Sequence, residues 1–181
     1  YLGFIENASL RMTRMLDDLL KYARVGIPEK AKQLVNLNSI LLLAKNNLGL
    51  KIQETKAKIQ IDELPILKGY QTFFLQIFQN LLANVLKFRK IGTAPDITIS
   101  YQKCRDNHLF AIKDNGIGME KKQVKNIFRA FHRLNTKECY EGSGLGLATC
   151  AELIKLMNGK IWAESVLGVG TTFFVALPKM K

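Results

Sequence analysis

The sequence has few of the residues that disulfide-linked domains and zinc sites require. Its 181 residues include only three cysteines, Cys104, Cys139 and Cys150, without Cys-x-x-Cys spacing, and only two histidines. An odd and scattered set of cysteines predicts neither a disulfide framework nor a structural zinc site. We therefore expect free thiols, which fit a reducing cytoplasm.

Long apolar runs are also absent from the sequence. The longest stretches, such as SILLLA at residues 39–44, are far shorter than the roughly 20 residues of a membrane-spanning helix. No signal peptide is recognisable. Because the first residue is Tyr1 and not Met, we interpret the chain as a fragment and expect any membrane anchor to lie outside it.

Acidic residues are scarce relative to basic ones. There are 15 Asp and Glu against 27 Lys and Arg, which gives a formal net charge of +12. Such an excess favours an anionic partner: nucleic acid, a membrane surface, a nucleotide or an acidic protein. The sequence shows no interleaving of aromatic and basic residues and no known recognition helix, which disfavours nucleic acid.

Two regions of different character follow one another. Residues 1–25 contain no proline, and Ile5, Ala8, Met12, Met15, Leu19 and Tyr22 recur at steps of three and four. This periodicity predicts a bundle helix that packs against further helices. Gly26 and Pro28 end it, so we interpret 26–34 as a linker and 35–181 as a second domain.

Helices and strands alternate in the second region. We predict strands at 33–35, 58–62, 96–102, 109–113, 160–166 and 171–178, the last two joined by a hairpin turn. Helices are predicted at 37–56 (capped by Asn36 or Asn38), 70–88, 121–131 and 145–159, and a loop at 63–69. This order predicts an α+β fold, a two-layer sandwich of a mixed β-sheet with helices on one face.

Two asparagines and a lysine share one face of the helix at 70–88. Asn80, Asn84 and Lys87 are spaced four and three apart. A solvated stripe is the ordinary explanation of such a pattern. Asparagine is, however, a poor residue for a helix interior. An amide oxygen can bind Mg²⁺ and a lysine can meet phosphate, so the face is a candidate ligand site.

The stretch IKDNGIGME at residues 112–120 ends a predicted strand. Asn115 and Gly116 alone would indicate a simple hairpin turn. The residues that follow are charged and helical in pattern, however, which does not fit a partner strand. Gly116 and Gly118 would let the backbone approach a flat ligand, and Asp114 could accept hydrogen bonds from an amino group.

A third stretch, EGSGLGLA, leads into a helix. Its glycines, Gly142, Gly144 and Gly146, precede or begin that helix, whose unpaired amides would suit a phosphate. The stretch lacks the Gly-Lys-Ser/Thr ending of a Walker loop, and no strand leads directly into it as a dinucleotide fingerprint requires. Alone, it is weak support for a phosphate site.

In combination the three stretches resemble the ATP-binding domain of sensor histidine kinases, whose superfamily includes gyrase, the large heat-shock chaperones and mismatch-repair ATPases. NLLANVLKF is similar to the asparagine motif, DNGIGM to the adenine-contacting motif, IFRAFHRL to the phenylalanine motif and GSGLGLA to a glycine motif. The resemblance covers about residues 35–178 and is closest to phytochrome-linked and hybrid kinases. Residues 1–25 resemble the second helix of the dimerisation and phosphoacceptor hairpin.

The resemblance implies a Bergerat-type ATP-binding fold and a set of ligand contacts. Asp114 would accept a hydrogen bond from adenine, Gly116 and Gly118 would shape the pocket floor, and Asn84 would ligate Mg²⁺. Phosphates would meet Asn80, Lys87, Gly142, Gly144, Leu145 and Gly146. Thr171 or Thr172 would line the adenine side, with Thr172 the preferred candidate, and residues 129–142 would form a lid.

The resemblance also implies an activity, the transfer of the γ-phosphoryl group of ATP to a histidine and then to an aspartate of a response-regulator receiver domain. Hydrolysing members carry a glutamate where Asn80 stands, and an amide cannot act as a general base. Neither His108 nor His132 lies on the bundle helix. We therefore expect the phosphoacceptor upstream of Tyr1, no self-phosphorylation, and a homodimer formed through bundle helices.

Three other functions stay open at this point. The same fold could serve a regulatory ATP-binding protein or a kinase that phosphorylates serine. The net charge of +12 also leaves a basic nucleic-acid-binding module, whose affinity would fall steeply as salt rises.

Overall fold

The computed structural model describes residues 31–132 and 143–179. Of the first 27 residues it describes only Ser9, Met12, Thr13, Leu16, Leu19, Leu20, Tyr22, Ala23, Gly26 and Ile27. Those from Ser9 to Ala23 are helical, as predicted for that segment. Gly142, Cys139 and most of the predicted lid lie outside the described residues. Among the described helices, none is both long and apolar enough to cross a membrane.

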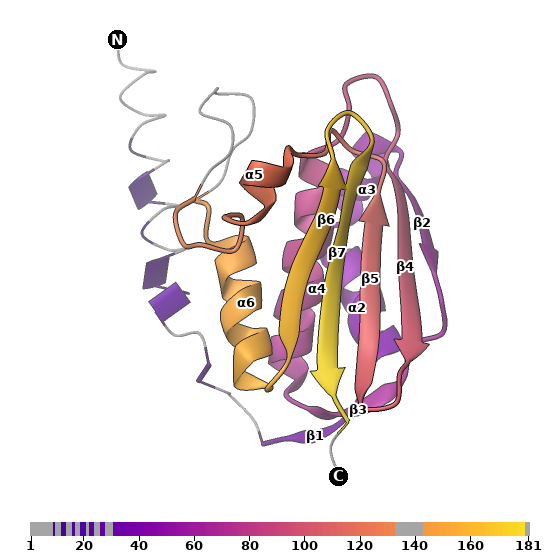
Figure 1. The fold of residues 1–181 in the computed structure, drawn as a ribbon, viewed down its shortest axis with the longest axis vertical. Coiled ribbons are helices and arrows are strands. Elements are labelled where there is room, and N and C mark those ends of the chain that lie inside the picture. The colour runs from indigo at the N-terminus through magenta and orange to yellow at the C-terminus, as the bar shows by residue number, and fades with distance from the viewer. Residues whose placement is uncertain are drawn as a thin grey trace.

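A five-stranded sheet forms one layer of the domain (Figure 1). In spatial order its strands are β2 (Lys58–Ile61), β4 (Asp96–Lys103), β5 (Asn107–Asp114), β7 (Gly170–Pro178) and β6 (Lys160–Val166). β2 and β4 are parallel, and all other neighbours are antiparallel. The sheet is therefore mixed, as predicted.

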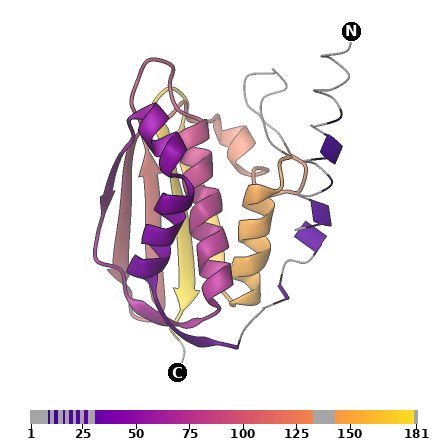
Figure 2. The same cartoon turned by 180° about the vertical axis from the view of Figure 1, so that it is seen from behind.

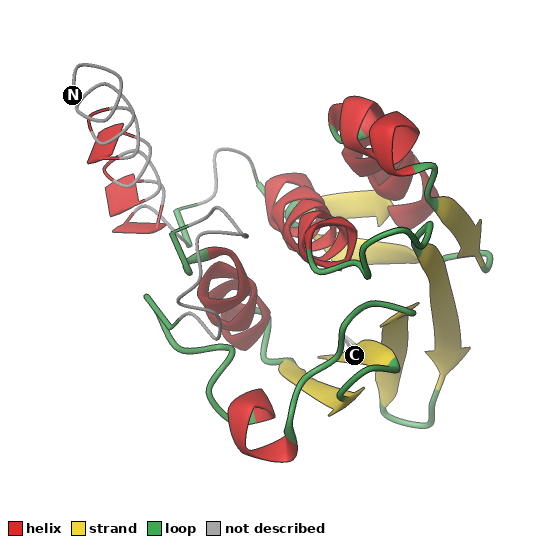
Figure 3. Cartoon of the chain, turned by 90° about the horizontal axis from the view of Figure 1, so that it is seen from above, coloured by secondary structure: helices red, strands yellow, loops and turns green. Residues whose placement is uncertain are grey.

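Helices cover one face of this sheet and form the second layer, which confirms the predicted α+β sandwich (Figures 2 and 3). The principal ones are α2 (Leu37–Asn47), α4 (Gln71–Lys87) and α6 (Gly146–Leu156). Between them and the sheet lies a core in which Phe110, Ile112 and Leu81 are almost completely buried. Each such side chain contributes about 1.5–3 kcal/mol by leaving water, so the core fixes how α4 and α6 lie on the sheet.

A two-stranded ribbon corrects the predicted loop at 63–69. β1 (Gln33–Asn36) pairs antiparallel with β3 (Ile66–Gly69). The prediction was wrong because β3 has only four residues, begins directly after Pro65, and pairs with a strand about 30 residues away in the chain. The local sequence pattern of residues 63–69 does not indicate that they pair with a strand so distant in the chain.

All four predicted helices are shorter in the structure, and two of them differ most from the prediction. The helix expected at 37–56 ends at Asn47, and a second helix, α3 (Gly49–Thr55), follows after Leu48. Gly49, the first residue of α3, weakens a continuous helix at this point. The helix expected at 121–131 is only α5 (Lys121–Val124), and the chain beyond it turns until Phe131, whose φ of 62° is left-handed. At the start of α2, Asn36 is the cap, accepting from the Asn38 amide at 3.0 Å.

Candidate functional site

Asn80 and Asn84 lie half-buried in the last two turns of α4, facing the start of α6. Asn80 donates from Nδ2 to the carbonyl oxygen of Gly146 at 3.1 Å, and Asn84 donates from Nδ2 to the carbonyl oxygen of Asn80 at 2.9 Å. Because a carbonyl oxygen only accepts hydrogen bonds, these contacts fix which amide atom is nitrogen. The Oδ1 atoms of both side chains are thus turned away from those carbonyls.

The start of α6 is shaped by glycine. Gly146 is its first residue, and a Cβ atom there would lie 3.7 Å from Oδ1 of Asn80 and 3.9 Å from Nδ2 of Asn84. Gly144 has a φ of 78°. Leu145 precedes the helix without a side-chain cap, and the first turn carries no acidic residue. These backbone amides and the helix dipole suit an anion beside the two asparagines.

Asp114 ends β5 and is only 9% exposed. Its Oδ1 accepts hydrogen bonds from the backbone amides of Gly116 at 2.7 Å and Thr171 at 3.2 Å. Burial raises the pKa of this carboxyl group, and the two amide hydrogen bonds and the charge of Lys90 oppose that rise. Oδ2 accepts no hydrogen bond from the described residues, so one oxygen is fixed and the other is available to a ligand.

The two glycines after Asp114 are explained by contacts within the protein. A Cβ atom on Gly116 would lie 2.5 Å from the carbonyl oxygen of Phe88. Gly118 has a φ of 64°, and its Cβ atom would collide with the carbonyl oxygen of Val166 in the hairpin between β6 and β7. Close approach of backbone was expected here, but the backbone that approaches is the chain's own. Contact of these glycines with a ligand stays a prediction.

The three predicted stretches meet at one end of the sheet, where β5 terminates (Figure 1). Phe88 follows α4, and its amide donates to the carbonyl oxygen of Asn84 at 3.0 Å. The Phe88 carbonyl in turn accepts from the amide of Ile117 at 3.0 Å. The loop after Asp114 is therefore bound to the end of α4, whose asparagines touch α6. Lys87 lies at the same end of α4, its Nζ 4.6 Å from the centre of the Phe88 ring.

Of the two threonines considered for this site, the structure brings Thr171 and not Thr172 next to Asp114. Thr171 is buried, and its amide donates to the Asp114 carboxylate. Thr172 pairs with Lys113 and, by the alternation of a strand, faces the opposite side of the sheet. Thr171 is therefore the threonine beside Asp114, and contact of Thr172 with a ligand stays a prediction.

Ser165 was missed by the sequence reasoning. Its Oγ accepts from the amide of Met119 at 2.8 Å and lies 2.9 Å from both the Gly170 carbonyl and the Thr171 hydroxyl. It thereby ties the glycine loop to the hairpin that carries Thr171. A serine within a strand is too common for any sequence signal to have singled it out.

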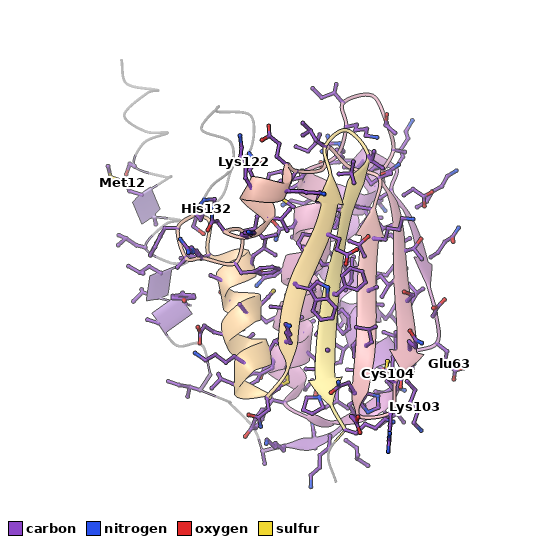
Figure 4. All side chains as sticks on the ribbon, in the orientation of Figure 1. Met12, Glu63, Lys103, Cys104, Lys122 and His132 are labelled. Atoms are coloured by element: carbon purple, nitrogen blue, oxygen red, sulfur yellow. The ribbon has the colours of Figure 1, made fainter. Side chains whose placement is uncertain are left out.

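Cys150, His108 and His132 are not among the predicted ligand contacts. Cys150 in α6 is completely buried, and burial raises the pKa of its thiol to about 12. His108 in β5 lies 2.9 Å from the Tyr101 hydroxyl through Nδ1. His132 follows the turns after α5 (Figure 4). Among the described residues, no group of three or more His, Cys, Asp or Glu side chains could hold a metal ion, so a cation here would depend on amide oxygens and on the ligand itself.

Two proteins with related sequences indicate the family of this chain. The cyanobacterial phytochrome A of Nostoc sp. is 41% identical over 174 residues, 96% of this chain and 22% of that protein. The sensor protein kinase WalK of Staphylococcus aureus is 27% identical over 183 residues, 98% of this chain and 44% of that protein. The chain thus spans less than half the length of either relative.

A solved structure and a family model also match this chain. ShkA, solved full-length in complex with AMPPNP, matches with a TM-score of 0.79 at 23% identity, over 98% of this chain and 38% of that one. The model of the histidine kinase-, DNA gyrase B- and HSP90-like ATPases matches residues 69–181, a range that contains α4, the loop after Asp114 and the start of α6. The chain therefore belongs to the family of histidine kinase-, DNA gyrase B- and HSP90-like ATPases.

Proposed function

We propose that this chain is the ATP-binding catalytic module of a two-component sensor histidine kinase. It transfers the γ-phosphoryl group of ATP to a histidine supplied by another segment or subunit, which passes it to an aspartate of a response-regulator receiver domain. Family membership and the kinase and phytochrome relatives support this assignment. The relative ShkA was solved with an ATP analogue, AMPPNP. We place the module in the cytoplasm, where ATP and receiver domains occur.

The observation that carries the proposal is the contact between α4 and α6. The amide nitrogens of Asn80 and Asn84 are held by carbonyl groups, and the Asn80 oxygen lies beside Gly146 at the glycine-rich start of α6. Oxygen ligands together with nucleotide phosphates are what Mg²⁺ prefers. Asn84 would hold the metal ion and Asn80 would lie beside it. When bound, Mg²⁺ supplies neutralisation of phosphate charge.

The other residues of the site contact either the adenine base or the phosphates of ATP. Oδ2 of Asp114 accepts a hydrogen bond from the adenine amino group, because Oδ1 is occupied by two backbone amides. Gly116 and Gly118 hold this loop against α4 and the hairpin. The amides of Gly144, Leu145 and Gly146 bind phosphate oxygens, and Lys87 adds a positive charge.

Transfer is favoured over hydrolysis by the chemistry of Asn80. Hydrolysis requires a group that takes a proton from water, and an amide does not do so at neutral pH. Phosphoryl transfer depends mainly on positioning and charge neutralisation, which the site residues provide.

The dimer contacts involve the helical segment at the start of the chain, and the phosphoacceptor lies on a helix that packs against this segment. His108 lies in β5 and is engaged with Tyr101, and neither it nor His132 lies on a helix. In the helical segment Met12, Leu16 and Leu20 are exposed apolar side chains. We propose that they pack against bundle helices of a homodimer, which also carry the acceptor histidine.

The test is the chemistry of the phosphate that the longer parent protein acquires from radiolabelled ATP. Phosphohistidine is stable to base and labile to acid, and we expect that behaviour, with loss of labelling in Asn84→Ala. Asn46→Ala is the control, because Asn46 is exposed on α2. Acid-stable, base-labile phosphate would assign a serine-directed kinase, and absence of labelling would assign a regulatory ATP-binding protein.

A further inference from the structure

A second cavity lies at the end of the domain opposite the candidate nucleotide site. It has a volume of about 290 Å³ and is bounded by β3, the ends of β7 and α6, and the starts of α4 and β5. His108 lines it near the start of β5, whereas Asp114 ends that strand. The two residues are six positions apart along the strand, roughly 20 Å. Figure 4 shows Lys103, which pairs with His108, at this end of the sheet.

The cavity has an apolar floor and an apolar rim. Phe74 and Leu177 are buried beneath it. At its edges Ile66 is 60% exposed and Leu156 is 53% exposed. When a ligand covers apolar side chains that border a concave surface, the free energy of the system falls, which favours binding. A volume near 300 Å³ is at the small end of ligand pockets, so the cavity suits a compact molecule.

The charged side chains that line the cavity are all basic. Its lining includes Lys32, Lys68 and His108 and no carboxylate. Lys32 is held nearby, with Nζ 5.5 Å from the centre of the Tyr70 ring. Burial and the charges of Lys179 and Lys103 lower the pKa of His108, so at pH 7 the positive charge comes from the two lysines.

The helix ends at the cavity do not change the sign of its positive potential. α4 begins at the cavity, next to Tyr70, without a side-chain cap or an acidic residue in its first turn. α6 ends there, at Leu156 and Met157. The partial positive charge of one helix start and the partial negative charge of one helix end have about equal size and offset each other. The lysines therefore determine the sign of the potential.

We propose that this cavity binds a small organic anion with an apolar body, such as an aromatic carboxylate or sulfonate. The anionic group lies towards Lys32 and Lys68, and the apolar body lies on Phe74 and Leu177 between Ile66 and Leu156. The site is separate from the nucleotide site and does not depend on its assignment. Lys32 directly precedes β1, and a Cβ atom on Gly26 would lie 2.5 Å from Cδ1 of Leu156, so a bound anion contacts both the domain and the segment leading into it.

The test uses two probes that differ in one charged group. 1-Anilinonaphthalene-8-sulfonate carries a sulfonate, and N-phenyl-1-naphthylamine is its uncharged counterpart. We expect the sulfonate to bind the chain more tightly, with amide shifts in NMR spectra confined to Gly69, Tyr70 and residues 156–158. The Lys32→Gln/Lys68→Gln variant should bind the sulfonate about tenfold more weakly.

The matched control is Lys51→Gln/Lys58→Gln, which removes the same charge from exposed positions outside the cavity. It should leave sulfonate binding unchanged. Equal weakening in both double variants would show a general charge effect and overturn the proposal. Equal binding of the two probes would show an apolar cavity without anion preference, and amide shifts at Asp114 or on the uncovered sheet face would show that the anion binds elsewhere.

Discussion

Asp114 shows how a single residue can serve both the fold and a ligand. Its Oδ1 accepts one backbone hydrogen bond from Gly116 in the loop after β5 and one from Thr171 in β7, while Oδ2 takes none from the described residues. A carboxylate buried in this way costs free energy that hydrogen bonds offset only in part. That cost is expected at a site that has to present an acceptor to a ligand.

The raised pKa of Asp114 leads to a prediction about stability and pH. The folded chain holds this proton more tightly than the unfolded chain, so folding loses stability as pH rises through the folded pKa. Asp114→Asn keeps an oxygen for the two amides and removes the charge. We expect the variant to be more stable than the wild type at pH 7, with a difference that shrinks as pH falls towards the ordinary value of 3.8.

Urea unfolding between pH 4 and pH 7 measures that difference. A control is Asp96→Asn, because Asp96 is an exposed aspartate on β4. A variant less stable than the wild type at pH 7, or a difference in stability that does not change with pH, would show that the ionised carboxylate does not destabilise the fold.

Residue types were more predictable than residue environments. Asn80 and Asn84 were chosen because asparagine is a poor residue for a helix interior, and Asp114 because the residues after it do not fit a partner strand and its carboxylate could accept hydrogen bonds from an amino group. The sequence could not show that Phe88 and Val166 crowd Gly116 and Gly118. Those contacts arise between segments distant in the chain, as does the contact that distinguishes Thr171 from Thr172.

At the scale of elements, the site depends on how the hairpin between β6 and β7 lies against the loop after β5. The amide of Gly168 donates to the Ile117 carbonyl at 2.7 Å, and Ser165 accepts from Met119. Gly118 lies directly against the Val166 carbonyl. The hairpin thus supports the loop from the side opposite α4.

Gly118 and Gly168 have similar backbone angles, so alanine substitutions at the two positions can distinguish the cost of backbone strain from the cost of a steric clash. Gly118 has a φ of 64° and no room for a Cβ atom, whereas Gly168 has a φ of 77° with open space around it. Gly168→Ala should cost about 1 kcal/mol of unfolding free energy from backbone strain alone. Gly118→Ala should cost about 3 kcal/mol, because the hairpin must also move.

Urea unfolding of both variants checks this difference. Equal losses would mean that the loop and the hairpin are not in contact, and the packing described for the site would then be incorrect.

Elements with strong local signals were predicted well and short paired segments were not. The helix expected at 70–88 is α4 at Gln71–Lys87, because a long apolar stripe defines it. β3 was missed, since four residues between Pro65 and Tyr70 form a strand only by pairing with β1. The break at Leu48, where α2 gives way to α3, was also missed, although Gly49 is a local signal for it.

For the whole molecule, topology explains why distant motifs meet. α4 and β5 both end, and α6 begins, at the same edge of the sandwich (Figure 1). The asparagines, Asp114 and the glycine loop are therefore gathered at that edge although about 66 residues separate Asn80 from Gly146. The net charge of +12 favoured an anionic partner, and a nucleotide is the anion that these side chains fit.

Calorimetric titration of the chain with a non-hydrolysable ATP analogue, with and without Mg²⁺, tests the central claim most directly. We expect binding that Mg²⁺ strengthens, a loss of about tenfold or more in Asp114→Asn, loss of most of the Mg²⁺ effect in Asn84→Ala, and wild-type behaviour in Asn46→Ala. Binding that is insensitive to Mg²⁺ and unchanged in Asp114→Asn and Asn84→Ala would contradict the claim that these side chains form one nucleotide site.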